Sequence, residues 1–194
     1  MRRGWSLPEV MLVSALMAVV LLIVTSTLAS TSRWTRQESQ RGFAMGQLQS
    51  VLAHVESLLQ RSCRAGVAYQ PPAHGASGVL AMHLQDPAPY VSTPLWEAHW
   101  TCLSWNPERR QVHHFPSPVP ARTQLPLLPS PAQLDQMAAG AGRRNLLASD
   151  VTDFDYALLV GPVAQIRLEL EINAGRTQPE KIQLSRKIYF RNRI

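Results

Sequence analysis

The sequence has few charged residues and only two cysteines. Charged side chains make up 16% of the 194 residues, whereas about 25% is typical of a soluble domain. Charge is missing altogether between Glu9 and Arg33. This uncharged window, residues 10–32, is long enough for about 30 Å of helix. The deficit predicts one membrane-inserted segment and argues against a wholly soluble cytoplasmic enzyme.

Motifs that would indicate an enzyme are also missing. The sequence contains no Gly-x-Ser-x-Gly elbow, no His-Glu-x-x-His, no paired Cys-x-x-Cys and no phosphate-binding glycine loop followed by Lys-Ser or Lys-Thr. We therefore predict that the chain is not an enzyme and needs no cofactor. An anchored periplasmic enzyme is the alternative with the least support.

Two groups of side chains are candidate metal ligands. The histidine group comprises His83, His99 and the pair His113 and His114. Adjacent residues on a strand point to opposite faces, so the pair cannot bind one ion together. The second group, Asp150, Asp153 and Asp155, lacks the glycine turn and the terminal glutamate of a calcium loop. We predict no metal site.

The ends of the apolar segment indicate how it is oriented. Arg2 and Arg3 precede it, and the positive-inside rule then places the N-terminus in the cytoplasm and the rest of the chain in the periplasm. A removable secretory signal is the alternative, with 27–29 as its cleavage site. Glu9 argues against that alternative, because an unpaired carboxylate in hydrocarbon costs about 2.5 kcal/mol or more.

The run from Gly4 to Leu16, Gly-Trp-Ser-Leu-Pro-Glu-Val followed by Met-Leu-Val-Ser-Ala-Leu, resembles the class III signal of type IV pilins and pseudopilins. The resemblance implies that a prepilin peptidase cuts between Gly4 and Trp5 and that the new amine of Trp5 is methylated. It makes Glu9 the fifth mature residue, which in this family faces the N-terminal amine of a neighbouring subunit in the fibre. Trp5 stands where the family usually has Phe.

A second apolar pattern follows the membrane segment. Its members recur at spacings of three and four and share one helical face: Leu48, Val51, Leu52, Val55, Leu58 and Leu59. The pattern predicts that the helix continues to about Arg61 and packs on a globular domain. Gly42 and Gly46 lie in the middle of the predicted helix, where they either permit a bend or allow close packing of the domain.

The remainder predicts a β-rich domain. Strands are expected at 79–84, 99–105, 111–115, 150–159, 163–172 and 181–190, with 173–180 as a hairpin loop. The expected fold class is α+β, in which the long helix packs on one face of a C-terminal antiparallel sheet in a pilin-like arrangement. The expected organisation is a leader at 1–4, a membrane and assembly helix at 5–33, an amphipathic extension at 34–61 and a head domain at 62–194.

A proline-rich stretch, 116–131, is expected to form an exposed loop that continues through 138–144. The two cysteines, Cys63 and Cys102, lie in the part of the chain assigned to an oxidising compartment. We therefore predict a disulfide between the end of the helix and a strand. A catalytic thiol is the competing interpretation.

The C-terminal strand is rich in cations. Alternation places Lys187, Arg191 and Arg193 on its polar face, where they could contact DNA phosphates. Arg186 falls on the apolar face and is expected to pair with an acid. The tryptophans at 96, 100 and 105 are expected in the core or at a subunit interface.

The stretch 146–154 and the ending 184–193 resemble PilW-like minor pilins and J-type pseudopilins. The resemblance implies a minor pilin that helps to initiate assembly of a type IV pilus. A minor pseudopilin of type II secretion and a DNA-capturing competence pilin are the alternatives. The implied partners are other pilin or pseudopilin subunits, the prepilin peptidase and the inner membrane. The implied location is a single pass through that membrane with the head in the periplasm, followed by a pilus or pseudopilus.

Overall fold

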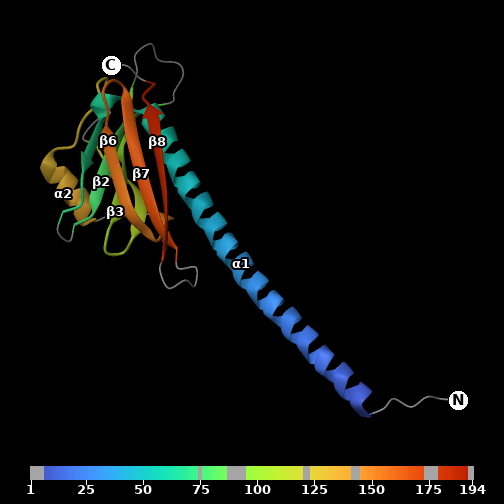
Figure 1. Ribbon diagram of the computed structural model, residues 1–194. Helices are drawn as coiled ribbons and strands as arrows, with labels where there is room; N and C mark the ends of the chain where they lie inside the picture. Colours follow the sequence, from blue (N-terminus) through green and yellow to red (C-terminus); the bar gives the residue numbers. More distant parts are fainter. Residues whose placement is uncertain are drawn as a thin grey trace. The chain divides into compact units, whose positions relative to one another are not determined.

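The computed structural model describes residues 7–73, 76–86, 95–119, 123–140, 145–172 and 179–191, and Figure 1 shows its elements. In chain order these are α1 (Leu7–Arg61), η1 (Arg64–Gly66), β1 (Val67–Gln70), β2 (Gly78–Gln85), β3 (Trp96–Asn106), β4 (Gln111–Pro118), α2 (Pro131–Ala139), β5 (Asn145–Ala148), β6 (Val151–Leu158), β7 (Val163–Ile172) and β8 (Glu180–Tyr189). The chain divides into two compact units, one ending at Gly42 and one beginning at Phe43. We call the second unit the head.

Helix α1 confirms the predicted helical segment and its end at Arg61. The last turns of the helix belong to the head, and the residues buried there are Ala44, Leu48, Val51, Leu52, Val55, Leu58 and Leu59. This set contains the whole apolar stripe read from the sequence. Spacings of three and four place these side chains on one face, so a single side of the helix enters the core.

The two glycines in the middle of α1 do not serve close packing. A Cβ atom added at Gly42 or Gly46 would meet nothing within 4 Å. Of the two roles expected for these glycines, the structure therefore excludes the packing role. What remains is their low helix propensity, which weakens α1 at the boundary between the two units.

The head contains two antiparallel sheets where one was expected. One sheet has the strand order β1-β2-β3-β4-β5 and the other has the order β6-β7-β8. The predicted strands correspond to β2, β3, β4, β6, β7 and β8, and 163–172 matches β7 residue for residue. The four-residue strands β1 and β5 were not predicted, because four residues are too few to establish an alternation.

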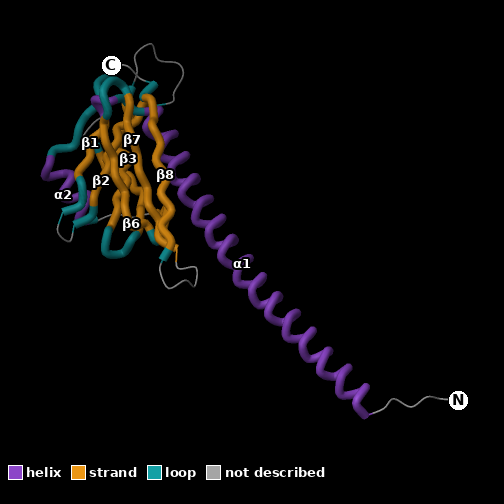
Figure 2. Tube along the Cα trace, in the orientation of Figure 1, coloured by secondary structure: helices purple, strands orange, loops and turns teal. Residues whose placement is uncertain are grey.

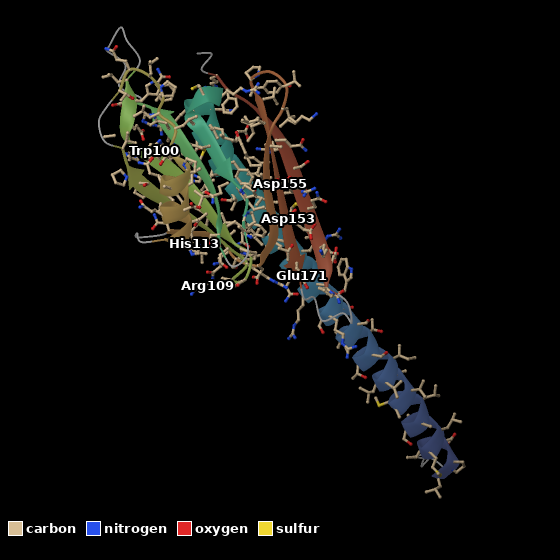
Figure 3. The ribbon with its side chains drawn as sticks, turned by 90° about the vertical axis from the view of Figure 1, so that its left-hand side faces the viewer. Trp100, Arg109, His113, Asp153, Asp155 and Glu171 are labelled. Carbon is tan, nitrogen blue, oxygen red and sulfur yellow. The ribbon has the colours of Figure 1, made fainter. Side chains whose placement is uncertain are left out.

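The inner faces of both sheets share one core with α1. That cluster joins Leu48 and Val55 of α1 to Leu103 of β3 and to Ile166 and Leu168 of β7. Figure 3 shows the two sheets on either side of the last turns of α1. The helix is thus held by two layers of apolar side chains, and burial of this surface is the main stabilising contribution in the head.

The proline-rich stretch corrects the expectation of one long loop. Pro116 and Pro118 belong to β4, and Pro131 begins α2 at the position where a missing N–H has no helical partner. The Ser130 side chain accepts from Gln133 N while the Gln133 side chain accepts from Ser130 N, which forms a capping box. Gly140 ends the helix in the left-handed conformation.

Helix α2 covers the outer face of the five-stranded sheet. Its buried residues Leu134, Met137 and Ala138 form a second core cluster with Ala81 of β2 and Phe115 of β4. Figure 2 shows α2 on the side of β2 away from the last turns of α1. Both faces of this sheet are therefore covered, which explains why seven of the eight residues of β2 are buried in succession.

Candidate functional site

The first candidate site is the N-terminal part of α1, whose apolar side chains are exposed. Leu7 is 78% exposed, Leu22 70% and Leu28 64%. No residue of its apolar window is buried in the structure, and the helix is long and apolar enough to cross a membrane. An uncovered apolar surface of this size is unfavourable in water, and this segment could lie in an apolar environment such as a membrane.

The polar side chains in this segment bond within the helix. Hydroxyl groups donate to carbonyl oxygens three or four residues earlier: Ser14 to Met11 (2.9 Å), Thr25 to Leu21 (2.8 Å), Ser26 to Ile23 (2.8 Å), Thr27 to Ile23 (2.8 Å) and Ser30 to Thr27 (2.9 Å). A hydroxyl satisfied in this way needs no water. The segment can therefore enter hydrocarbon without leaving these donors unpaired.

Glu9 lies in the first turn of α1. A carboxylate at a helix N-terminus is stabilised by the partial positive charge of the helix dipole. Gly4 and Trp5, the predicted cleavage and methylation positions, lie outside the described residues. The fold therefore places the acid at the start of an exposed apolar helix.

The predicted DNA contacts lie around β8. Lys187 and Arg191 are exposed, and Arg193 is outside the described residues. Arg186 points to the inner face and pairs with Glu56 of α1, as expected. Lys181 Nζ donates to Glu169 Oε1 at 2.8 Å, which holds the pKa of the Glu169 carboxyl below its usual value.

Acidic side chains also gather on the outer face of β6-β7-β8. Asp153 and Asp155 lie beside Arg167, whose Nη2 is 3.0 Å and 3.7 Å from their respective Oδ2 atoms. Glu171 pairs with Arg110 at 2.8 Å, and Figure 3 labels these acids on the same sheet. Lys187 thus belongs to a face of mixed charge, not to a basic patch.

The four histidines considered for a metal do not converge. His114 contacts His54 of α1, with ring centroids 5.2 Å apart, whereas His113 is paired with Ser104 on the opposite face of the sheet. Burial lowers the pKa of His114, and His54 and His99 lower it further. Within the described part of the chain, no group of three or more His, Cys, Asp or Glu residues could hold a metal ion.

His83 is fully buried and uses both ring nitrogens for hydrogen bonds. Leu127 N donates to His83 Nδ1 at 2.9 Å, and His83 Nε2 lies 2.7 Å from Glu97 O. Trp100 Nε1 donates to Leu127 O at 2.9 Å. The two side chains bind both backbone groups of Leu127 and hold the segment 123–130 on the sheet. We call this arrangement the Leu127 clamp, and no motif in the sequence indicates it.

The predicted disulfide is corrected by the structure, because Cys63 and Cys102 are both free and buried. Cys102 points from β3 toward α2, where its Sγ lies 3.7 Å from Met137 Sδ. Cys63 follows α1 and precedes η1, outside the α2 cluster that contains Cys102. Burial raises the pKa of Cys102 to about 12 and also raises that of Cys63, so neither thiol is an activated nucleophile.

A groove of about 320 Å³ lies beside α2, and its lining includes Trp100, Phe115, Pro116, Gln136 and Met137. None of the described residues that line this groove is titratable, so these residues offer no group for acid or base chemistry. Its position follows from α2, whose sequence signal was the Ser-Pro-x-Gln pattern at 130–133.

These features define an α+β protein with a long N-terminal apolar helix that could span a membrane, followed by two antiparallel sheets. No protein-family model matches the chain, and no curated protein or solved structure matches it.

Proposed function

We propose that this chain is a minor pilin, an assembly subunit of a type IV pilus that is processed between Gly4 and Trp5. The observation that carries the proposal is α1, one continuous helix with two different surfaces. Its first part exposes apolar side chains all round, and its last turns are part of the head core. A helix of this kind can carry a folded head from a bilayer into a bundle of similar helices.

The proposed mechanism is physical and involves no catalysis. The exposed apolar part of α1 lies first in the membrane and then among the helices of other subunits, two environments that both exclude water. Hydroxyls bonded within the helix suit both environments. Glu9 pairs with the N-terminal amine of a neighbouring subunit, which compensates the cost of placing a carboxylate among apolar helices.

Intact mass spectrometry of protein extracted from membranes tests the processing step. The mature chain is expected to begin at Trp5 with one methyl group on its amine. Substitution Gly4→Leu should leave the full-length chain, because a side chain at this position obstructs the peptidase cleft. Ser6→Ala is the matched control and should be processed normally. A wild-type chain that begins at Met1 or Ser30 would contradict the proposal.

The role of Glu9 is tested by Glu9→Gln in a strain that assembles the fibre. The variant should be processed and inserted normally but should be absent from sheared fibres, because it lacks the charge that pairs with the neighbouring amine. Ser14→Ala changes a polar residue of the same helix without removing charge, and it should assemble as the wild type does. Equal incorporation of the Gln variant would refute the assigned role.

A minor pseudopilin of type II secretion would have the same processed N-terminus and differ only in its partners. Co-purification from cross-linked membranes separates the two possibilities. Pilus subunits in the captured complex support the minor pilin, and secretion components support the pseudopilin.

A further inference from the structure

The strands that border the two sheets differ in how open they are to another strand. Strands β1 and β5 have only four residues each. Along β6, Tyr69 Oη donates to Phe154 O at 3.4 Å and covers part of the edge. Strand β8 has ten residues and no proline. Among the described residues, β8 is therefore the longest uninterrupted edge.

The hydrogen-bond ladder between β7 and β8 determines which backbone groups of β8 face outward. Phe190 N donates to Pro162 O at 2.9 Å, in register with the pairs of β7 and β8. In an antiparallel ladder the residues of hydrogen-bonded pairs alternate with residues whose backbone groups point away. The N–H and C=O groups at positions 181, 183, 185, 187 and 189 therefore point away from β7.

This edge is accessible to solvent. Ser185, Arg186 and Lys187 are exposed in succession, although Arg186 is on the inner face beside Glu56. Where only one face of a strand is covered, exposed and buried residues alternate, so three exposed residues in a row indicate that the edge itself is open. Figure 2 shows β8 as the last strand of its sheet.

The end of β4 shows the opposite arrangement. Val119 N donates to Ala98 O at 3.0 Å, so the backbone at 116 and 118 points away from β3. Both positions are prolines, and the described pairing with β5 stops at His114. Proline has no N–H, so this edge cannot continue the ladder. One edge of the head is closed to strand addition, while β8 retains its donors and acceptors.

The charge along β8 selects the kind of strand that fits. The segment 180–191 carries Lys181, Arg186, Lys187 and Arg191 against one acid, Glu180. Lys181 and Arg186 already have acidic partners, whereas Lys187 and Arg191 have none among the described residues. Two copies joined through this edge would bring like charges together, which is unfavourable. An acidic strand would pair with the two cations that remain.

We propose that the free edge of β8 binds an extended, acidic segment of a different protein by β-strand addition. Main-chain hydrogen bonds to the outward-facing backbone groups supply the affinity, and contacts of acidic side chains with Lys187 and Arg191 supply the selectivity. This inference depends only on the strands of the head and not on the proposed pilin function. Loss of this binding would leave processing and assembly unaffected.

The test uses the full chain in detergent micelles and a fluorescent blocked peptide in which threonine and glutamate alternate. Fluorescence anisotropy should show saturable binding to the wild type. Ser185→Pro removes one outward N–H without touching the β7-β8 ladder and should weaken binding about tenfold, as should Lys187→Glu. Arg36→Glu makes the same charge change at an exposed position of α1 outside the head and should leave binding unchanged.

Amide exchange of the unmodified chain tests the proposal without the proline variant, so the test holds even if that variant misfolds. The bound peptide should slow amide exchange at 183, 185 and 187 and should not change it at 182 and 184. Equal binding of a threonine-lysine peptide would overturn the proposal, as would unchanged binding by Ser185→Pro. A single-stranded oligonucleotide is also added as a competitor. If it displaces the peptide equally from the wild type and from Ser185→Pro, the surface binds through charge alone and the proposed strand addition is wrong. Self-association of the chain through β8 would also overturn the proposal, because the strand that binds would then belong to a second copy of this chain.

Discussion

His83 should make the stability of the head depend on pH. The Leu127 N–H donates to His83 Nδ1, so the neutral ring carries its proton on Nε2 and donates to Glu97 O. A second proton on Nδ1 would remove the acceptor that Leu127 needs. Burial lowers the pKa of His83 from its ordinary value, which is the direction expected for a ring whose neutral form is required by its partners.

The magnitude follows from the two hydrogen bonds. His83→Phe would leave a buried N–H and a buried carbonyl without their partners, and each loss costs about 1–3 kcal/mol. The free energy of unfolding should therefore fall by about 2–6 kcal/mol at neutral pH. A ring with a lowered folded pKa stabilises the head fully above about pH 6.5. As the pH falls below that value, this contribution decreases by up to about 1.4 kcal/mol per pH unit, until the folded pKa is reached.

Chemical denaturation followed by tryptophan fluorescence measures the effect. Trp96 is a local reporter, because its ring centroid lies 5.4 Å from that of His83. His83→Gln is the pH control, since glutamine does not titrate. The wild type should have a larger free energy of unfolding than His83→Gln at about pH 7.5. This difference should decrease as the pH is lowered to about 5. His114 also has a lowered pKa, but it is present in both proteins and its effect cancels. A difference in unfolding free energy that stays constant with pH would refute this reasoning.

Three further predictions concern the helix and the thiols. Gly42→Ala and Gly46→Ala should each stabilise α1 by about 1 kcal/mol and slow amide exchange around them about fivefold, because the added methyl groups meet nothing. Leu52→Ala should lower the unfolding free energy of the head by about 2–5 kcal/mol, whereas Leu21→Ala, at an exposed position, should not change it. A reductant should leave the denaturation midpoint unchanged, and Cys102 should react with thiol reagents only after unfolding.

The parts of the fold that were predicted correctly are those specified by neighbouring residues. The stripe from Leu48 to Leu59 and the alternation of 163–172 each repeat with a period that identifies one buried face. The buried face can therefore be identified without knowing which segment packs against it. The capping signal at Ser130 was equally local, but the density of prolines around it led to the prediction of a loop.

The sequence by itself determined an apolar helix long enough for a membrane, an acid at its start, and the faces that α1 and the long strands bury, because each depends on composition or period along the chain. Only the tertiary structure decided that there are two sheets, that Cys102 faces α2 and not Cys63, and that His83 and Trp100 bind Leu127. It also decided that β4 ends in a closed edge and β8 in an open one. These features depend on which distant segments meet and in which register. A shift of one residue in the pairing of a strand would turn each of its side chains to the opposite face of the sheet.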